Sequence, residues 1–233
     1  MDDLEDFIIS EPYELTEEDK AAIQEASPLQ KKGTHWGNRC LNEFKTRFRD
    51  DMEPKQNYIC AYCRLELHPN EATPEIEHIV DKGNYPDWMY EPFNLCLSCK
   101  LCNTKKSTKN VLVDESVTEL PQDSASYLII HPHLDKYSDY MEFVGDVLYR
   151  PIGDSNSKGA KTIEICELNR IEVAIARAIQ YFNIHGTGEH YVDFLLLMDK
   201  PANRELVKDE EFERFQKNLK ARIKAFVRRQ RQG

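Results

Sequence analysis

The stretch that decides the fold contains Cys60-Ala-Tyr-Cys63, Glu75-Ile-Glu77-His78-Ile79, Asn94-Leu95 and Cys99-Lys-Leu-Cys102-Asn103, in that order. A two-residue spacer lets both sulfurs of a cysteine pair face one ion, and four thiolates close the tetrahedral site that zinc prefers in structural centres. The sequence therefore predicts a structural Zn²⁺ ion bound by Cys60, Cys63, Cys99 and Cys102.

The alternative interpretation of these cysteines is two disulfides or four unrelated buried thiols. The remaining cysteines, Cys40, Cys96 and Cys166, are scattered, and the chain has no recognisable secretory signal. Both features are typical of a reducing compartment, where disulfides are rare. Cys96 lies close enough to Cys99 to compete as a ligand. The matched spacing favours Cys99 with Cys102, and we expect Cys96 in the core.

The segment between the cysteine pairs predicts a short strand. Polar and apolar residues alternate over Glu75–Val80, which is typical of a half-buried strand. On a regular strand Glu77 and His78 point to opposite faces, unless the end of the strand twists or bulges. A shared pocket for these two side chains therefore depends on the local backbone.

A helix is expected over Lys100–Lys109, beginning at the second cysteine pair. On this helix Asn103 and Lys106 share a face, because residues three apart are neighbours on a helical surface. Lys105 or Lys106 could add positive charge beside a bound phosphate. The alternative for Lys105 is a solvated helix face, since lysine side chains are mostly exposed.

The motif Cys-x-x-Cys, Glu-His-Ile, Asn-Leu, Cys-x-x-Cys-Asn-x-x-Lys resembles the HNH endonucleases over residues 58–110. Their core is a ββα-metal finger. The resemblance implies that His78 is the general base that deprotonates water. It also implies that Glu77 and Asn103 hold one catalytic divalent cation, Mg²⁺ or another, against the scissile phosphate. Asn94 would brace the loop and orient His78, and Lys106 completes the candidate catalytic set.

Three positions depart from the commonest pattern of that family. Glu77 stands where Asp is usual, and Asn103 replaces the last His, although the Asn form also occurs in the family. Val80-Asp81 stands where a Pro often follows His-Ile. The longer Glu arm changes the reach of the carboxylate, and Asp81 is a reserve ligand.

The chemistry implied is coherent on physical grounds. A phosphodiester resists attack because its oxygens are anionic, and a bound cation screens that charge and stabilises the leaving alkoxide. A neutral imidazole is suited to accepting the proton of the attacking water.

The net charge of −10 is unusual for an enzyme that acts on nucleic acid, because phosphate contact calls for a basic surface. The charges are unevenly distributed. Residues 1–28 carry ten acids and one base, whereas residues 214–231 carry eight bases and no acid. Residues 29–58 have a surplus of three positive charges, and residues 111–160 carry nine acids and three bases. This pattern predicts weak binding by the chain alone and a partner that presents the nucleic acid.

The sequence divides into three expected parts. Residues 1–28 form an acidic segment, either a disordered tail or a docking segment for a partner. Residues 29–110 form the HNH core with its preceding helix. Residues 111–233 form a mainly helical region that packs on the core and includes a β-hairpin. No stretch is long and apolar enough to cross a membrane, so a soluble, cytoplasmic protein is expected.

The flanking elements follow from capping and periodicity. The predicted helices run from a cap at Thr16 to about Ala26, then over 38–49, 160–182 and 205–231. A strand is predicted over 127–130, a hairpin over 141–149, a polar loop over 155–159, and a short apolar helix or strand over 191–198. The fold class is therefore α+β, with a zinc-stabilised ββα-metal (HNH) core and flanking N- and C-terminal helices.

A looser resemblance extends over residues 58–177. The order Leu128-Ile-Ile-His-Pro132, a hairpin, Ala160-Lys-Thr-Ile163, Glu167-Leu-Asn-Arg170 and Arg177 is similar to one HNH subgroup. That subgroup comprises the PtuB nuclease subunits of Septu antiphage systems and related retron-linked HNH proteins. It implies a bacterial defence effector that works with an ATPase partner of the PtuA type, which accounts for the acidic charge.

The function predicted is a metal-dependent HNH endonuclease that cleaves DNA, or alternatively RNA, within a defence complex. Two rival functions remain. One is a standalone restriction-type nuclease, which would cut unaided. The other is a non-catalytic zinc module that docks proteins or nucleic acid, which has no reason to enclose Glu77-His78 and to follow Cys102 with Asn103.

Overall fold

The computed structural model describes residues 8–27, 31–67, 74–144 and 148–170, together with 173–174, 176–177 and 217. The chain divides into two compact units. The first contains residues 8–141 and 151–167 within the described ranges, and the second contains 142–150 and the described residues from 168 onward. The predicted three-part division stays a prediction. The predicted site residues all belong to the first unit.

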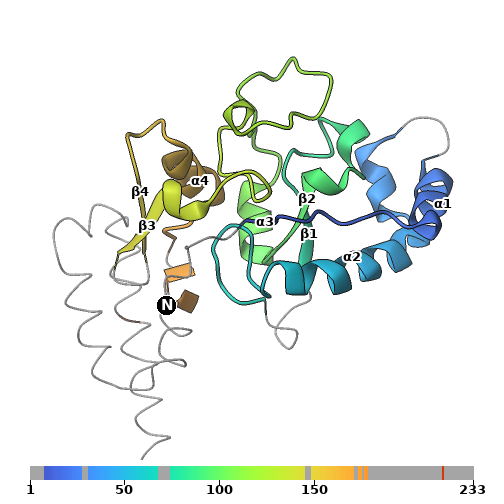
Figure 1. Ribbon diagram of the computed structural model, residues 1–233, viewed down its shortest axis with the longest axis horizontal. Helices are drawn as coiled ribbons and strands as arrows, with labels where there is room; N and C mark the ends of the chain where they lie inside the picture. Colours follow the sequence, from blue (N-terminus) through green and yellow to red (C-terminus); the bar gives the residue numbers. More distant parts are fainter. Residues whose placement is uncertain are drawn as a thin grey trace, which may run out of the picture. The chain divides into compact units, whose positions relative to one another are not determined.

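Two short strands and a helix form the centre of the first unit (Figure 1). Strand β1 (Glu75–His78) pairs antiparallel with β2 (Leu95–Ser98), so that His78 lies opposite Leu95. Helix α3 (Lys100–Lys106) follows β2 and contacts β1. The strand and the helix start where the sequence predicts, and both end earlier. The protein is thus of mixed α/β type, with small sheets.

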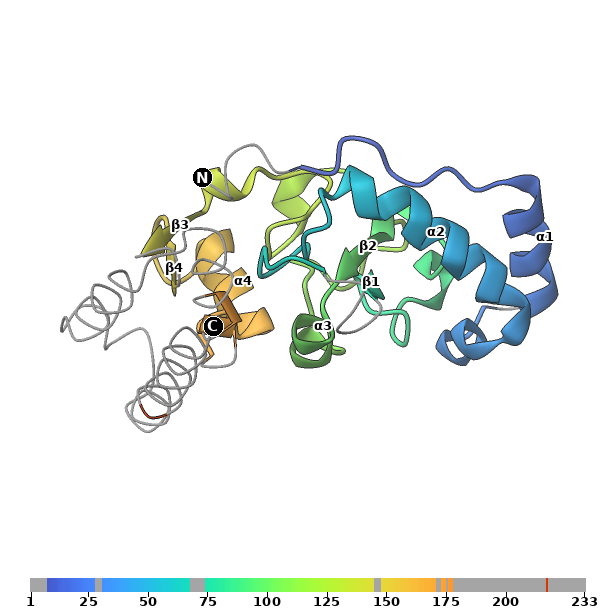
Figure 2. The ribbon, with the colours of Figure 1, turned by 90° about the horizontal axis from the view of Figure 1, so that it is seen from below.

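Helix α2 (Asn42–Lys55) packs against β2 and supplies much of the core (Figure 2). Its side chains Phe44, Phe48 and Met52 are fully buried, and they recur at every fourth residue, as expected for one helical face. The predicted helix over 38–49 is wrong at both ends. A 3₁₀ turn occupies Arg39–Leu41, and the apolar stripe continues to Met52, which carries the helix one turn further.

Helix α1 (Glu17–Ala26) has the predicted cap and the predicted end. The Thr16 side chain accepts from the Asp19 N–H, and the Asp19 carboxylate accepts from the Thr16 N–H. This reciprocal arrangement satisfies two backbone donors at the helix start. Asp19 is fully buried and also accepts from Tyr13 Oη at 2.6 Å and from Arg47 of α2 at 2.5 Å. One carboxylate therefore fastens α1 to α2.

The predicted strand over 127–130 is wrong. Tyr127 forms only an isolated bridge with Leu112. The Leu128 N–H donates to Val111 O, whereas the Ile130 N–H donates to the Thr162 hydroxyl. Because these donors go to different segments, no strand ladder forms.

Helix α4 (Lys158–Cys166) also departs from the prediction. It begins inside the expected polar loop, because the Ser157 side chain caps it. Within the expected helix over 160–182, α4 ends at Cys166, where Glu167 adopts a left-handed conformation (φ 49°, ψ 49°), and the described residues 173–174 and 176–177 are helical again. A residue in that conformation is a common helix stop.

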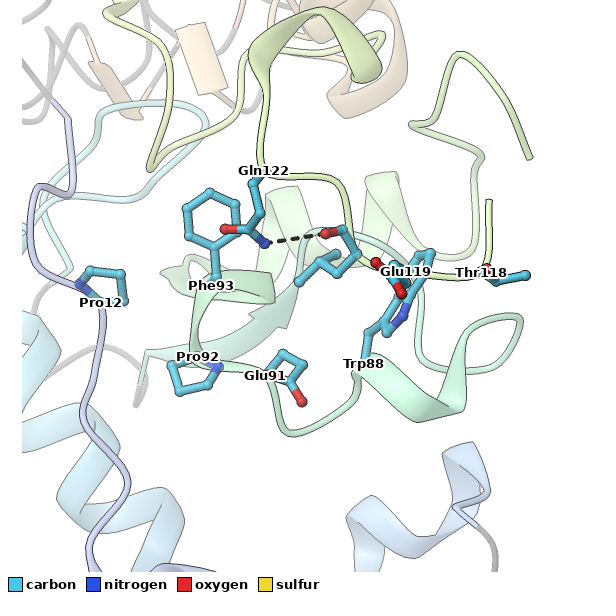
Figure 3. Close-up of a pocket in the computed structure, with 9 residues that line it drawn as sticks. Pro12, Trp88, Glu91, Pro92, Phe93, Thr118, Glu119 and Gln122 are labelled. Carbon is cyan, nitrogen blue, oxygen red and sulfur yellow. Dashed lines mark hydrogen bonds between the residues drawn. The ribbon is translucent and has the colours of Figure 1, made fainter. Parts of the chain in front are cut away.

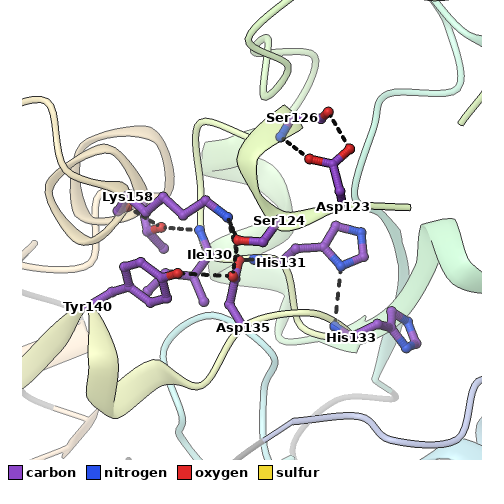
Figure 4. Close-up of polar contacts among 10 residues, drawn as sticks. Asp123, Ser124, Ser126, Ile130, His131, His133, Asp135, Tyr140 and Lys158 are labelled. Carbon is purple, nitrogen blue, oxygen red and sulfur yellow. Dashed lines mark hydrogen bonds and ion pairs between the residues drawn. The ribbon is translucent and has the colours of Figure 1, made fainter. Parts of the chain in front are cut away.

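A buried polar cluster holds the 121–135 segment to α4 (Figure 4). Asp135 accepts from Lys158 Nζ at 2.7 Å, from Ser124 Oγ at 2.5 Å and from the His131 N–H at 2.7 Å. The Tyr140 hydroxyl also donates to it at 3.3 Å, so the carboxylate has a cation and three neutral donors around it and its burial is compensated. We interpret the cluster as a structural anchor.

The second unit contains the predicted hairpin. Strand β3 (Met141–Val144) pairs with β4 (Leu148–Pro151), and the turn between them lies outside the described residues. The predicted element at 191–198 is also outside them, as is the predicted helix at 205–231 except for helical Lys217. Among the described helices, none combines the length and apolar character required to span a membrane.

Candidate metal centre and catalytic pocket

The four predicted zinc ligands lie together. The Sγ atoms of Cys60, Cys63, Cys99 and Cys102 are all within 4.8 Å of one another. The Sγ atoms of Cys63 and Cys99 are 3.7 Å apart. A tetrahedron with Zn–S bonds of about 2.3 Å has S–S edges of about 3.8 Å, so the spacing of the four sulfurs is close to that of a zinc site. The cluster can therefore hold a structural zinc, whereas Cys96 is buried in β2, outside the cluster.

Local backbone geometry sets up this cluster. The first cysteine pair lies in a tight turn, in which Arg64 N donates to Cys60 O and Cys60 N donates to Leu65 O. Arg64 takes a positive φ of 55° to close the turn. Cys99 lies at the start of α3, and its N–H points at Cys60 Sγ at a distance of 3.3 Å. A backbone N–H directed at sulfur favours the thiolate, which is the form that binds metal.

Three of the predicted site residues, Glu77, His78 and Asn103, line one pocket. Its volume is about 250 Å³, and it lies at the junction of β1, the loop after β1, and α3. It is lined by Ile76, Glu77, His78, Asp81, Lys82, Asn103, Thr104, Ser107 and Thr108. Glu77, His78 and Asn103, which the sequence predicts to act together, are therefore brought to a common space. Their catalytic roles stay predictions.

His78 is held in one tautomer. Its Nε2 atom lies 3.2 Å from the carbonyl oxygen of Met89, so this nitrogen carries the hydrogen and Nδ1 keeps its lone pair. The Trp36 indole packs edge-on against the imidazole, with ring centroids 4.5 Å apart. Burial lowers the pKa of His78 well below its usual value, and the charges of Lys82 and Lys106 add to this. The ring is therefore a neutral base.

Glu77 has a buried counter-ion. Its Oε1 atom lies 2.7 Å from Lys106 Nζ and accepts from the Tyr62 hydroxyl at 3.3 Å. Burial raises the pKa of Glu77, and the ammonium of Lys106 opposes that shift. Lys106 also donates to the carbonyl oxygen of His78 at 2.8 Å. One cation thus supports both members of the Glu-His pair.

The two candidate cations of α3 are engaged away from the pocket. Lys106 is fully buried and does not belong to the described pocket lining, so its ammonium meets the Glu77 carboxylate instead of an incoming phosphate. Lys105 is paired with Glu167 at 2.8 Å, and 45% of its side chain is exposed. The structure therefore agrees with the alternative of a solvated face for Lys105.

Asn103 is oriented by a residue that sequence reasoning missed. Its Nδ2 atom donates to Glu75 Oε2 at 2.5 Å. This bond identifies the amide nitrogen and leaves the Oδ1 atom as the acceptor. Glu75 lies two residues before Glu77 on β1, and residues two apart share a face of a strand. The alternation of Glu75 and Glu77 along the predicted strand is the sequence feature that could have identified Glu75 as a site residue.

Asn94 is hydrogen-bonded to the backbone of the loop after β1, and its predicted role in orienting His78 stays a prediction. It is fully buried, accepts from the Val80 N–H at 2.7 Å and donates to the carbonyl oxygens of Val80 and Trp88. Trp88 directly precedes Met89, whose carbonyl receives the His78 hydrogen. Asn94 is therefore a positioning residue, since it lies outside the described pocket lining.

Asp81, the predicted reserve ligand, shapes the turn after β1. Its Oδ2 atom accepts from the N–H groups of Gly83 and Asn84, each at 3.0 Å. Asp81 also belongs to the pocket lining. The carboxylate therefore fixes the loop that carries the next residue, Lys82, into the wall of the pocket.

A larger hollow of about 620 Å³ lies elsewhere in the first unit (Figure 3). Its wall combines Trp88, Phe93 and two prolines with the carboxylates of Glu91 and Glu119, and its described lining includes no lysine or arginine. Two negative charges without a basic neighbour disfavour a phosphate backbone. The larger hollow is therefore the poorer candidate for a nucleic-acid site.

Comparison with known proteins confirms the predicted resemblance. The chain resembles the Septu protein PtuB of Bacillus thuringiensis, with 27% identity over 161 residues, which are 69% of this chain. The matched residues are 52% of the relative, so the chain spans about half the length of that curated protein. No family model matches the chain.

Proposed function

We propose that the chain is a metal-dependent HNH endonuclease that hydrolyses phosphodiester bonds in DNA, with RNA as the alternative substrate. The observation that carries this proposal is the pocket that gathers Glu77, His78 and Asn103 beside the four-cysteine cluster. The order of two antiparallel strands and a helix around that pocket supports a ββα-metal core. A structural zinc alone would need none of the three pocket residues.

Glu77 and Asn103 are the residues that would hold the catalytic cation. A carboxylate oxygen and an amide oxygen are ligands that Mg²⁺ accepts, and both side chains line the pocket. When bound, a divalent cation screens the anionic phosphate and stabilises the leaving alkoxide. Lys106 pairs with Oε1 of the Glu77 carboxylate at 2.7 Å, and its ammonium opposes the rise in the pKa of Glu77 that burial causes. The hydrogen bond to Glu75 fixes the orientation of the Asn103 side chain.

His78 would act as the general base at Nδ1. The Met89 carbonyl holds the hydrogen at Nε2, so the free lone pair belongs to the nitrogen that can accept a proton from water. Asn94 and Trp36 keep the loop and the ring in place. Because the imidazole is already neutral and in the required tautomer, it can accept a proton from water without first losing a proton or exchanging tautomers.

We further propose that the nuclease is the effector subunit of an antiphage defence complex of Septu type, with an ATPase partner related to PtuA. The resemblance to PtuB supports this assignment. The net charge of −10 supports a partner as well, because an acidic chain binds nucleic acid poorly by itself. The partner would capture the substrate and present it to the pocket.

The test is a cleavage assay on the complex co-purified with the tagged chain, with and without Mg²⁺. The variant His78→Ala should abolish cleavage while the zinc content and a cooperatively folded protein are retained. The variant His35→Ala, at a histidine outside the pocket, is the matched control and should cleave normally. Full activity of His78→Ala would remove the proposed base.

The same preparation separates the rival functions. Cleavage by the purified chain without its partner indicates a standalone nuclease of restriction type. A zinc-docking module should bind no second, hard cation, so a Mg²⁺ titration without saturable binding and without cleavage indicates that function. Recovery of an ATPase with the tagged chain supports the defence complex.

A further inference from the structure

Lys82 is the one lysine in the described lining of the catalytic pocket. Its ammonium makes no hydrogen bond or ion pair with the residues that the structure describes, in contrast to Lys105, paired with Glu167, and Lys106, paired with Glu77. Lys82 is half-buried, and within the described residues its ammonium has no counter-ion to occupy it. It is therefore available to bind an anionic ligand in the pocket.

The backbone of Lys82 is held in place. Asp81 caps the turn that follows it, and Tyr85 N donates to Asp81 O at 2.9 Å. On the other side Gly33 packs so closely that an added Cβ would lie 2.9 Å from the Lys82 carbonyl oxygen. The ammonium therefore extends from a fixed base, which reduces the entropy lost when it binds a ligand.

The charge of Lys82 acts on the catalytic pair. After burial, it is the largest contribution that lowers the pKa of His78, and it acts to lower the pKa of Glu77 as well. Lys82 lines the same pocket as Glu77 and His78, which is where the scissile phosphate must lie if His78 activates water. It is thus well placed to contact a phosphate oxygen.

The rest of the pocket wall suits a sugar–phosphate backbone. Thr104, Ser107 and Thr108 are exposed hydroxyl residues at the end of α3. Apart from the imidazole of His78, the described lining contains no aromatic ring on which a base could stack. Proteins that bind unpaired bases use such aromatic platforms.

We infer that Lys82 binds the phosphodiester of the substrate in this pocket, and that the pocket recognises the backbone and not the base. The inference rests on the proposed nuclease function, because it names the side chain that holds its substrate. It replaces Lys105 and Lys106 as the phosphate-binding cation.

The experiment measures binding of a short labelled DNA duplex to the co-purified complex at several salt concentrations. All chains carry His78→Ala, so binding is observed without turnover. Adding Lys82→Ala should weaken binding about tenfold and reduce the slope of log K against log salt by about 0.9, the value for one lost phosphate contact. Lys82→Arg should restore most of the affinity. Lys105→Ala is the matched control and should leave both quantities unchanged.

A cleavage arm on chains with His78 intact distinguishes the two proposals. Lys82→Ala should raise KM more than it lowers kcat. If no chain cleaves but binding depends on Lys82, the nuclease proposal fails and the phosphate contact stands. If wild type cleaves and Lys82→Ala binds and cleaves equally well, the inference is overturned while the nuclease proposal survives. Failure of the complex with the His78→Ala background to bind duplex also overturns the inference.

Discussion

Lys106 Nζ lies 2.7 Å from Glu77 Oε1, and the exposed fractions of the two side chains are 0% and 4%. This buried ion pair joins α3 to β1 beneath the catalytic pocket. The same ammonium donates to the carbonyl oxygen of His78. The residue that resembles a substrate-binding lysine in the sequence is therefore the internal counter-ion of a metal-ligand candidate.

Removal of that counter-ion should destabilise the fold strongly. Lys106→Met leaves a buried carboxylate without its partner, which costs about 3–5 kcal/mol of unfolding free energy. The double variant Glu77→Gln/Lys106→Met should recover a large part of the loss, because no buried charge remains. Urea denaturation of wild type, both single variants and the double variant measures the coupling. Additive effects of the two substitutions would show that the pair does not interact.

The four-cysteine cluster should bind zinc and be needed for folding. Cys102→Ser should reduce zinc content from one ion per chain to well below one and abolish cooperative unfolding of the zinc-bound form, since structural zinc contributes directly to folding free energy. Cys40→Ser, outside the cluster, should keep full zinc content. Elemental analysis and thermal melts provide both readouts. Retention of zinc by Cys102→Ser would exclude Cys102 as a ligand.

Asp19 should make the protein sensitive to acid. Burial acts to raise the pKa of Asp19, but hydrogen bonds from Tyr13, Arg47 and the Thr16 N–H outweigh it, and the net pKa is lowered. A carboxyl group whose folded pKa is depressed stabilises the fold above its unfolded pKa of about 3.9 and loses that contribution as the pH falls through the folded value.

Asp19→Asn should therefore lose about 2 kcal/mol at pH 7 and less at acid pH. Urea midpoints of wild type and variant at pH 7 and at pH values below 4 provide the comparison. Asp51→Asn, at a more exposed carboxylate paired with Lys55, is the control and should change little at either pH. A constant difference between Asp19→Asn and wild type at all pH values would contradict the assignment.

Ser107 should be strained. It ends α3 with φ 47° and ψ −130°, a conformation in the positive-φ range that glycine adopts far more readily than serine. Ser107→Gly should stabilise the protein by about 1 kcal/mol. Ser107→Ala keeps the strain and removes only the hydroxyl, so it should not stabilise. Chemical denaturation of the two variants separates backbone strain from loss of the side chain.

The rate of cleavage should not depend on the identity of the two bases that flank the scissile phosphate. The described pocket lining offers hydroxyls, carboxylates and Lys82 but no stacking ring beyond His78. Duplexes that differ only at the two bases flanking the cut should be cleaved at similar rates by the complex. A strong preference that survives substitution of the partner's DNA-binding surface would assign base recognition to this chain.

The cysteine spacing and the helix cap could be predicted because both depend on neighbours in the chain. Two thiolates separated by two residues converge within one turn, and Thr16 with Asp19 closes a capping box within one helical turn. The shared pocket of Glu77 and His78 does not follow from the sequence alone. On a regular strand these side chains point apart, and their meeting depends on how the end of β1 joins the loop braced by Asn94.

The predicted lengths of secondary-structure elements are wrong where tertiary contacts compete with the periodicity of the sequence. The apolar pattern after Ala160 continues, and the described residues 173–174 and 176–177 are helical, but α4 itself ends at Cys166, where Glu167 pairs with Lys105 and Lys109 of the α3 region. Likewise Tyr127–Ile130 has the composition of a strand, yet its N–H groups find acceptors on unrelated segments. Such partners are distant in sequence, so no local pattern records them.

By itself, the sequence determined the ligands that can close around zinc and the residue types brought to the pocket, because short spacers and local capping need no distant partner. Only the tertiary structure decided which lysine faces that pocket. Lys106 pairs with the buried carboxylate of Glu77, and Lys105 pairs with Glu167. Lys82 lines the pocket because the turn that carries it is capped by its neighbour in the chain. The physical reason is that ion pairing and burial depend on distances between segments, which the order of residues does not specify.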